Sequence, residues 1–409
     1  MDTYDYIIVG AGIGGIVLAK KIKEQGLTYV MLEASDHLGG RINSTSVDDA
    51  WFELGAARVL SSQHRVMNLI HELNLELEEQ LLTDAAVYME GIWHDSLNEL
   101  LSNIEYPDPL ELFHALLDKT GIVNLSDFER LAPLEWDRVL TLDWLEAEGI
   151  PTAFSIRYFL GDIDVTMNQI TLYESMYFFV SNLSALDSKV YRMQGGLSQL
   201  VNTLSHHMKP PLYKQHVEQV SYTTDGVIVK TSNQTYQSRK VVFTCSLNAL
   251  SHVELPTEAK DSLTNFLAVG HYGKSIKGII TFNSNVFPSH EYLITEDPLR
   301  MLRRSEFHWE LYLPSLEKSW DRDEIMKRLH VYFGVDSVRD FKLHTYNMAP
   351  FYGCYWNYKS GYFHRIFEFS KAQRLAERVY SVGEHFSLNP NWIEGTLESV
   401  DQFILNDSK

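Results

Sequence analysis

The sequence predicts an α/β protein that begins with a β–α–β unit. Residues 5–9 form a short apolar run typical of a buried strand, and residues 13–25 have the apolar periodicity of a helix. A second apolar run follows at residues 29–32 and ends on Glu33. A strand, a helix and a strand in this order predict two parallel strands joined by a crossover helix.

A glycine-rich turn lies between the first strand and the helix, and each glycine has a mechanical role. Gly10 allows the tight turn, Gly12 lets backbone N–H groups approach a pyrophosphate, and Gly15 lets helix and strand pack closely. Free N–H groups at the helix N-terminus face the phosphate charge. Glu33, at the end of the second strand, can accept hydrogen bonds from a ribose diol. The segment therefore predicts a Rossmann-like site for a dinucleotide, without saying which one.

Length, composition and charge limit the function classes. The 409 residues suffice for two domains or one large interleaved pair. With 45% hydrophobic and 12% aromatic residues, the chain can form both a large core and an apolar pocket. The net charge of −19 argues against nucleic-acid binding, which needs a basic face. No apolar run is long enough to span a bilayer, so we expect a small-molecule partner and no membrane.

Cysteine usage and the first residues predict a reducing compartment. Cys245 and Cys354 are the two cysteines of the chain and provide no disulfide framework. Met1 leads almost directly into the first strand, so we expect no secretory signal and a cytoplasmic location. The histidines lack metal-ligand spacing, and no nucleophile elbow is evident. We therefore expect neither a bound metal nor hydrolase chemistry.

Two motifs after Glu33 carry a resemblance to a known family. The first is the turn Leu38-Gly39-Gly40-Arg41, and the second, at residues 52–58, reads Phe-Glu-Leu-Gly-Ala-Ala-Arg. Together with the glycine-rich turn, they resemble the flavin-dependent amine oxidases, which include monoamine, polyamine and L-amino acid oxidases. In this family the Gly-Gly-Arg turn lies against the FAD pyrophosphate, and the second motif passes beside the isoalloxazine ring. The resemblance implies FAD contacts at Gly40, Arg41, Gly55, Ala56, Ala57 and Arg58.

The resemblance covers nearly the whole chain and implies an α/β fold with interleaved domains. A Rossmann-like FAD-binding domain is expected from residues 1–80, 190–270 and 371–409. An α+β substrate-binding domain is expected from residues 81–189, which have helical apolar periodicity, and from residues 271–370. Within the helical part, we expect the aromatic cluster at residues 173–179 to be core rather than pocket wall.

Further FAD contacts are implied in the second half of the chain. Residues 227–229 and 241–243 predict a pair of hairpin strands, and the resemblance implies that the backbone at Val217 contacts the adenine. A strand at residues 379–382 precedes the final helix, whose N-terminal N–H groups can face the flavin carbonyl. The contacts implied in this part are Glu384, Trp392, Ile393 and Thr396.

Lys277 is the first predicted catalytic residue. It interrupts an apolar strand run at residues 275–280. In the family a lysine at this point holds a water over flavin N5 and is linked to reoxidation of the flavin by oxygen. The alternative is a lysine on the solvent face of a strand, which is the usual place for lysine. Lys274, three residues earlier, is the other candidate for the role.

Arg58 bears on the substrate. In L-amino acid oxidases the corresponding segment supplies an arginine whose planar fork binds the substrate α-carboxylate. The following Gln63-His64-Arg65 also resembles those enzymes, whereas Leu60 stands where they often have proline. The alternative is a surface arginine or a phosphate contact.

Two aromatic residues match the walls that flank the amine in this family. These are Tyr355 and Trp392, whose rings would favour an amine by their negative faces. The alternatives are ordinary packing for both, or the neighbouring Trp356 or Tyr358 in the role of Tyr355.

Cys354 raises the question of a covalent cofactor. The Gly-Cys-Tyr at residues 353–355 also occurs in monoamine oxidases, where the cysteine bonds FAD covalently. Other relatives bind FAD without a bond, and a buried free cysteine usually serves as a small hydrophobe. We expect non-covalent FAD, with a covalent link at Cys354 as a possible variation, and we expect Cys245 only to pack.

The sequence therefore predicts an FAD-dependent oxidase that converts a primary amine, and first of all an L-amino acid, to the imine by hydride transfer to flavin N5. Oxygen is the expected acceptor, and hydrogen peroxide and ammonia are the expected products. One alternative is a polyamine or aryl-amine oxidase, and a second is a flavin-binding protein without oxidase activity. A homodimer is a possible assembly.

Overall fold

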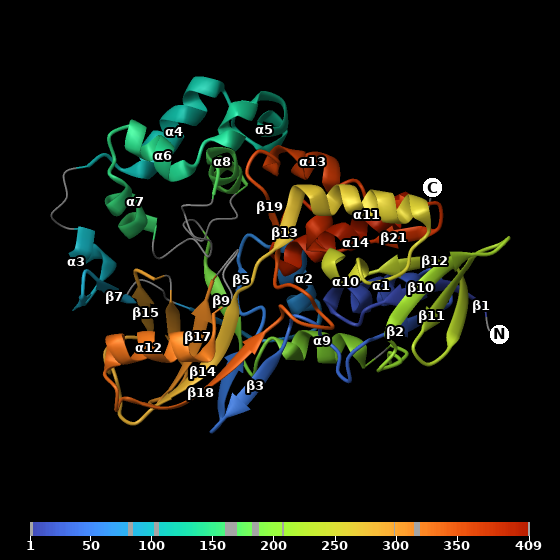
Figure 1. Ribbon diagram of the computed structural model, residues 1–409, viewed down its shortest axis with the longest axis horizontal. Helices are drawn as coiled ribbons and strands as arrows, with labels where there is room; N and C mark the ends of the chain where they lie inside the picture. The colour runs from blue at the N-terminus through green and yellow to red at the C-terminus, as the bar shows by residue number, and fades with distance from the viewer. Residues whose placement is uncertain are drawn as a thin grey trace.

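The computed structural model consists of two large sheets with helices packed around both (Figure 1). One sheet contains strands from both ends of the chain, and the other is built mainly from residues 276–345. Helices from residues 109–180 cover one end of the molecule, at the upper left of Figure 1. The described residues are 3–80, 85–101, 106–159, 170–181, 188–206, 208–297, 299–314 and 320–407.

The first sheet holds the predicted β–α–β unit. Strand β1 (Thr3–Val9) pairs in parallel with β2 (Tyr29–Leu32), and helix α1 (Ile13–Glu24) connects them. On its other side β1 pairs in parallel with β12 (Thr235–Phe243), which also pairs in parallel with β21 (Val379–Ser381). The first and last parts of the chain therefore meet in one sheet, and the predicted strands and helix at the N-terminus are confirmed.

A hairpin extends this sheet. Strands β10 (Val217–Tyr222) and β11 (Val227–Thr231) are antiparallel, and β11 pairs with the first half of β12. The hairpin partners of residues 227–229 are residues 236–238 rather than the predicted 241–243. Residues 241–243 belong to the same long strand but pair with β1 and β21 instead.

The second large sheet has the strand order β18-β14-β17-β16-β15-β7-β8. Its strands are β7 (Ala85–Met89), β8 (Ile92–His94), β14 (Ile276–Phe282), β15 (Tyr292–Thr295), β16 (Arg300–Arg303), β17 (His308–Leu313) and β18 (Val338–Thr345). Helix α12 (Arg322–Phe333) contributes buried side chains to the core of this sheet.

The two strands β7 and β8 differ from expectation, because residues 81–189 have helical periodicity in the sequence. Strand β7 pairs in parallel with β15, a partner about 200 residues later in the chain, and β8 forms the sheet edge. Three of the five residues of β7 are alanine or methionine, which favour helices. Pairing with a distant strand overrides that local preference.

Helices make up most of the remaining part of residues 81–189. They are α3 (Leu97–Leu101), α4 (Pro109–Thr120), α5 (Leu125–Leu131), η1 (Leu134–Arg138), α6 (Thr141–Ala147), α7 (Thr152–Phe159) and α8 (Leu172–Val180). Local signals define α4: Asp108 accepts a hydrogen bond from the N–H of Leu110, and Gly121 ends the helix in the left-handed conformation. Edge-to-face contacts of Phe128 with Tyr173 and Tyr177 hold α5 against α8.

The remaining strands of the described residues form three small sheets, apart from β20 (Arg374–Ala376), which pairs with β21 in the first large sheet. The short strands are β3 (Ser44–Val47), β4 (Ala50–Glu53), β5 (Val59–Leu60), β6 (Leu77–Glu79), β9 (Val190–Met193), β13 (Gly270–Tyr272), β19 (Trp356–Tyr358) and β20 (Arg374–Ala376). The other helices are α2 (His64–Glu72), α9 (Ser198–Ser205), α10 (Leu247–Leu250), α11 (Thr257–Val269), η3 (Phe363–Arg365), α13 (Ile366–Phe369), η4 (Glu384–Phe386) and α14 (Ile393–Asp407). The exact boundaries of the two domains stay a prediction from the sequence.

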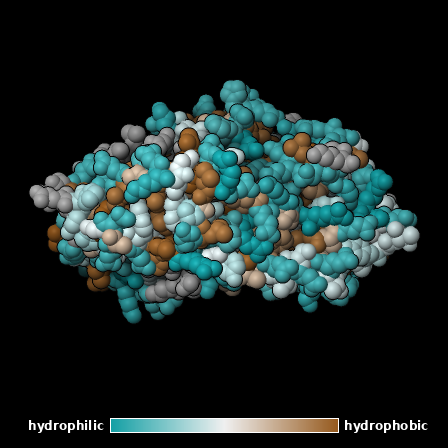
Figure 2. All heavy atoms as spheres, turned by 90° about the horizontal axis from the view of Figure 1, so that it is seen from above, coloured by the Kyte–Doolittle hydropathy of each residue, from teal (hydrophilic) through white to brown (hydrophobic). Residues whose placement is uncertain are grey.

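The surface carries no single dominant apolar face in the view of Figure 2, where hydrophobic side chains are interspersed among hydrophilic ones. Among the residues that the structure describes, no helix is both long enough and apolar enough to cross a membrane.

The packing of α1 on β1 depends on Gly15. A Cβ at this position would lie 2.0 Å from the carbonyl oxygen of Gly10, whereas the nearest neighbour of a Cβ at Gly12 would be the carbonyl oxygen of Gly39, at 3.9 Å. We predict that Gly15→Ala lowers the free energy of unfolding by about 1–3 kcal/mol, because the backbone must shift. Gly12→Ala is the control and should change the free energy of unfolding of the ligand-free protein by less than about 0.5 kcal/mol. Urea unfolding followed by circular dichroism measures both; equal effects would contradict the packing role.

Candidate active site

One cavity brings together almost all of the predicted site residues. Its wall includes the ends of β1 and β2, the inner face of the second large sheet, and part of α8. Gly15 is the exception, since it is buried beneath the wall and contacts Gly10. The predicted residues on the wall are Gly10, Gly12, Glu33, Gly40, Arg41, Gly55, Ala56, Ala57, Arg58, Val217, Lys277, Cys354, Tyr355, Glu384, Trp392, Ile393 and Thr396.

The glycine-rich end of the cavity has the features of a nucleotide cradle. Gly10 has a φ of 110°, a conformation that favours glycine. No side chain caps the N-terminus of α1 at Gly12, so the N–H groups there have no side-chain acceptor. The Glu33 carboxylate is fixed by the N–H groups of Ala11 at 2.7 Å and Ser35 at 2.8 Å. A carboxylate has further acceptor positions for a ribose diol, so this end fits a dinucleotide.

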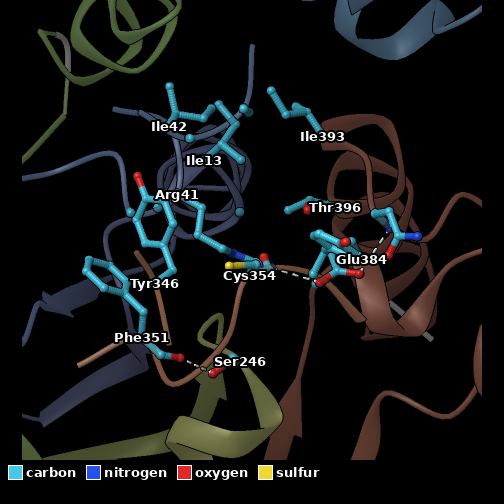
Figure 3. A pocket seen from close by; sticks show the side chains of 18 of the residues that line it. Ile13, Arg41, Ile42, Ser246, Tyr346, Phe351, Cys354, Glu384, Ile393 and Thr396 are labelled. Atoms are coloured by element: carbon cyan, nitrogen blue, oxygen red, sulfur yellow. Dashed lines mark hydrogen bonds and ion pairs between the residues drawn. The ribbon is translucent and has the colours of Figure 1, made fainter. Parts of the chain in front are cut away.

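A buried ion pair forms another part of the wall. The Arg41 guanidinium donates to the Glu384 carboxylate at 2.9 Å and to the Cys354 carbonyl at 2.6 Å, an arrangement visible in Figure 3. Glu384 also accepts the N–H groups of Trp356 and Asn391, both at 3.2 Å. The carboxylate therefore has several donors, as a buried charge requires. These contacts join three distant segments around the same space.

The face of the second sheet presents Lys277 to the cavity. The register places Lys277 on β14 opposite Tyr312 of β17 and His344 of β18. Its ammonium lies 5.2 Å from the centre of the Tyr312 ring, and both neighbours also line the cavity. Burial lowers the pKa of His344, and its Nε2 atom is buried without a hydrogen-bond partner among the described residues. The solvent-face alternative for Lys277 therefore does not hold, while Lys274 is exposed.

Lys277 is held by Glu310, a residue that the sequence analysis did not single out. The Lys277 Nζ atom lies 3.4 Å from Glu310 Oε1, and Arg304 donates from Nε and Nη2 to Glu310 Oε2 at 3.1 and 2.8 Å. The backbone N–H of Glu53 donates to the same Oε2 atom at 2.9 Å. Burial raises the pKa of Glu310, but the charges of Arg304 and Lys277 and this N–H outweigh it and bring the pKa to about 2. An acidic residue inside an otherwise apolar strand was the available signal.

Glu53 has a carboxyl group in a different environment. It accepts hydrogen bonds from the N–H of Leu197 at 2.6 Å and the hydroxyl of Ser44 at 2.7 Å. Burial raises the pKa of Glu53 to about 7, although these two donors act in the opposite direction. The side chain therefore links β3 and β4 to the start of α9, while its backbone holds Glu310.

Aromatic and apolar side chains form the rest of the wall. Tyr355 shares a hydrogen bond of 2.9 Å with the Ser275 hydroxyl, and Trp392 lies just before α14. The expectation that the cluster at residues 173–179 is core was wrong for two of its members, because Phe178 and Phe179 line the cavity. Tyr173 and Tyr177 are buried, since residues four apart share a helix face and the next two turn away from it. The other apolar wall residues from the helical part are Leu110, Phe113 and Ile170.

The two cysteines and Arg58 also lie on the wall. Burial raises the pKa of the Cys354 thiol to about 11 and that of Cys245 to about 12. The Cys354 thiol donates to the carbonyl oxygen of Ser275 at 3.2 Å. Cys245 packs against the core and also lines the cavity. Arg58 is half-buried and faces the same space.

Comparison with known proteins assigns the family. The sequence profile of the flavin-containing amine oxidoreductases matches residues 13–399. The chain belongs to this family. The match spans nearly all of the chain, as the resemblance implied.

Curated relatives of this flavin-containing amine oxidoreductase match over part of their length. It is 24% identical to pseudooxynicotine dehydrogenase of Pseudomonas sp over 309 residues, which is 69% of this chain and 60% of the relative. It is 26% identical to polyamine oxidase 1 of Zea mays over 268 residues, 60% of this chain and 53% of the relative. A shorter match, to putrescine oxidase of Kocuria rosea, is 35% identical over 85 residues, 21% of this chain and 18% of the relative. The matched region thus spans 60% or less of each relative.

Solved structures share the fold over the whole chain. Putrescine oxidase bound to putrescine aligns with a TM-score of 0.79 at 15% identity, covering 100% of this chain and 99% of that one. Cyclohexylamine oxidase from Brevibacterium oxydans aligns with a TM-score of 0.76 at 18% identity, covering 99% and 98%. At these identities the likeness concerns the fold alone, and it confirms the predicted α/β fold class.

The raised pKa of Glu53 predicts a pH-dependent stability. Between pH 4.5 and about 7 the folded protein keeps a proton that the unfolded chain releases, so the free energy of unfolding falls as pH rises through this window. The contribution is on the order of 3 kcal/mol. The side chain in Glu53→Gln cannot ionise, so the free energy of unfolding of this variant should not fall across the window as that of wild type does. Measured relative to wild type, the variant should therefore gain stability between pH 5 and pH 8. Urea unfolding at both pH values measures the difference, and Glu258→Gln, at an exposed position, is the control. An equal pH dependence in wild type and Glu53→Gln would contradict this.

Proposed function

We propose that the protein is an FAD-dependent amine oxidase. One observation carries the proposal: a single cavity joins the cradle at Gly12 and Glu33 to a pocket with Lys277 and aromatic walls. A dinucleotide in the cradle can therefore extend its reactive ring to the place where a substrate would lie. Family membership supports flavin as that ring.

The residues present fit FAD. Glu33 would hold the adenosine ribose, and the N–H groups near Gly12 and Gly40 would face the pyrophosphate. Val217 would contact the adenine, and the start of α14 at Thr396 would face the flavin. FAD, when bound, supplies the acceptor for the hydride that leaves the substrate carbon. We propose non-covalent binding, because the raised pKa of Cys354 keeps its thiol protonated and a thiolate is the nucleophilic form.

The chain's own residues would bind the amine, orient it and exclude water from around it. Tyr355 and Trp392 would flank it, and Phe178 and Phe179 would exclude water and contact the apolar part of the substrate. Lys277 would hold a positive charge at the cavity wall. We propose that oxygen takes up the two electrons to give hydrogen peroxide, and that water releases ammonia from the imine.

We propose an apolar primary amine, of the aryl or alkyl type, as the substrate. The acidic residues on the described wall are Glu33, Glu310 and Glu384, and each is already engaged by N–H donors, in two cases also by cations. Glu33 would bind the ribose, and the other two carboxylates are paired with cations, so none would be left for the second ammonium of a polyamine. None of the relatives reported above is an amino acid oxidase by name, and two are a putrescine and a polyamine oxidase, so their names support an amine substrate and do not separate monoamines from polyamines.

An L-amino acid is the second candidate, because Arg58 faces the cavity. A planar guanidinium there could bind an α-carboxylate. A flavin-binding protein without oxidase activity would have the same cradle but release no peroxide with either substrate class.

The cofactor proposal predicts tight, releasable FAD. When FAD is added to the apoprotein, binding should quench the flavin fluorescence. Gly12→Ala should weaken this binding at least tenfold, because a methyl group would occupy the space of the pyrophosphate. Acid precipitation should leave the yellow colour in the supernatant. Colour in the pellet that disappears in Cys354→Ala would instead establish a covalent bond. Failure of the folded wild type to bind FAD would contradict the proposal.

The substrate proposal predicts an order within matched pairs. Peroxide release with 2-phenylethylamine should exceed that with L-phenylalanine at least tenfold in kcat/KM, and butylamine should exceed putrescine. Each pair differs by one charged group, so the ratio reports that group alone. If the amino acid is preferred, Arg58→Ala should lower its kcat/KM by about ten- to hundred-fold and leave the amine unchanged. Equal losses for both would exclude carboxylate binding by Arg58.

A further inference from the structure

We propose that Glu310 is a positioning residue that fixes the ammonium of Lys277 at the cavity wall, with Arg304 as the cation that balances its charge. The inference deepens the proposed function, since Lys277 is the residue expected to act beside the flavin. It rests on the contacts of Glu310 with Lys277 of β14, with Arg304 and with the backbone of Glu53 in β4.

The geometry places Glu310 next to Lys277 on the same face of the sheet. Glu310 lies directly opposite Ile279, and Lys277 is two residues before Ile279, so the two charged side chains are diagonal neighbours. Their closest atoms are 3.4 Å apart. The Lys277 side chain is 15% exposed and that of Glu310 is fully buried, so water screens the pair only weakly.

The charge balance assigns the two cations different roles. Arg304, with a side chain only 4% exposed, donates twice to Oε2 and alone neutralises the carboxylate. Lys277 contacts the other oxygen and so adds a net positive charge to the cavity wall. One cation is enough to neutralise a carboxylate in a purely structural ion pair. The second cation, Lys277, is held where it faces the substrate space.

Among the described residues that face Lys277, Glu310 is the acceptor within hydrogen-bond reach, and the Glu53 carboxyl acts on Lys277 only through its charge. Tyr312 offers its ring on one side, His344 lies on the other, and the carboxyl of Glu53 is bound by Ser44 and Leu197. The Glu53 backbone N–H fixes Glu310 Oε2 from a third direction. Glu310 is therefore anchored independently of Lys277 and can determine its place.

Labelling of lysines tests the inference without turnover. In the full-length protein stripped of FAD, reductive methylation modifies only neutral amines, and mass spectrometry gives the rate for each lysine. Glu310→Gln leaves the Lys277 ammonium beside Arg304 without a counter-charge, so methylation of Lys277 should rise tenfold or more. Exposed Lys274 is the internal control and should not change. An unchanged rate at Lys277 would overturn the proposal.

A second variant guards against misfolding. Glu310→Asp keeps the charge beside Arg304 but withdraws the carboxylate from Lys277 by one methylene. It should fold, as thermal unfolding will show, and give an intermediate methylation rate. A rate equal to wild type would count against positioning by Glu310.

A double-mutant cycle then links positioning to catalysis. With FAD and an amine, Glu310→Gln should lower kcat at least tenfold and leave KM within threefold. In the Lys277→Met background the same substitution should change kcat less than twofold. Equal losses in both backgrounds, or a raised KM for putrescine but not for butylamine, would overturn the proposal. If wild type oxidises no amine, the proposed function fails, while the methylation rates still decide the role of Glu310.

Discussion

The buried ion pair of Arg41 and Glu384 is the constraint on which the cavity depends. The two residues are 343 positions apart in the sequence, and the side chain of Glu384 is only 4% exposed. A buried carboxylate is unfavourable unless donors surround it, and Glu384 finds them in Arg41, Trp356 and Asn391. Because these donors come from different parts of the chain, their hydrogen bonds hold the early turn, strand β19 and the C-terminal segment together. That arrangement encloses the site.

The two ends of the cavity are lined by different kinds of chemical group. The nucleotide end uses backbone N–H groups and glycines, which can approach a ligand closely and carry no net charge. The substrate end uses side chains: an ammonium balanced by Glu310 and Arg304, and aromatic rings. Glu53 links β4 to the start of α9 through its carboxyl group and to Glu310 through its backbone N–H. A shift of β4 would therefore disturb Glu310 at the cavity wall.

The sequence predicts the parts of the site that depend on neighbouring residues. The strand, turn and helix around Gly10 to Gly15 follow from local pattern, whereas the sequence predicts the hairpin partner of β11 at residues 241–243 and it lies at residues 236–238. Glu310 and Arg304 could not be predicted, because their contact with Lys277 depends on the register of β14 against β17. Strand β7 shows the same limit, since its pairing with β15 decides its structure. Phe178 and Phe179 share a short helix with core residues, and only the packed structure distinguishes their faces.

The first sheet also bears on the order in which the protein folds. Strand β1 pairs with β12, helix α14 packs against α1, and the cavity wall includes both Gly12 and Thr396. Contacts between segments so far apart in the sequence require the closure of long loops, which makes them slow to form. The glycine-rich turn can therefore form from local interactions, whereas the wall around it is complete only after β12 and α14 have joined β1 and α1.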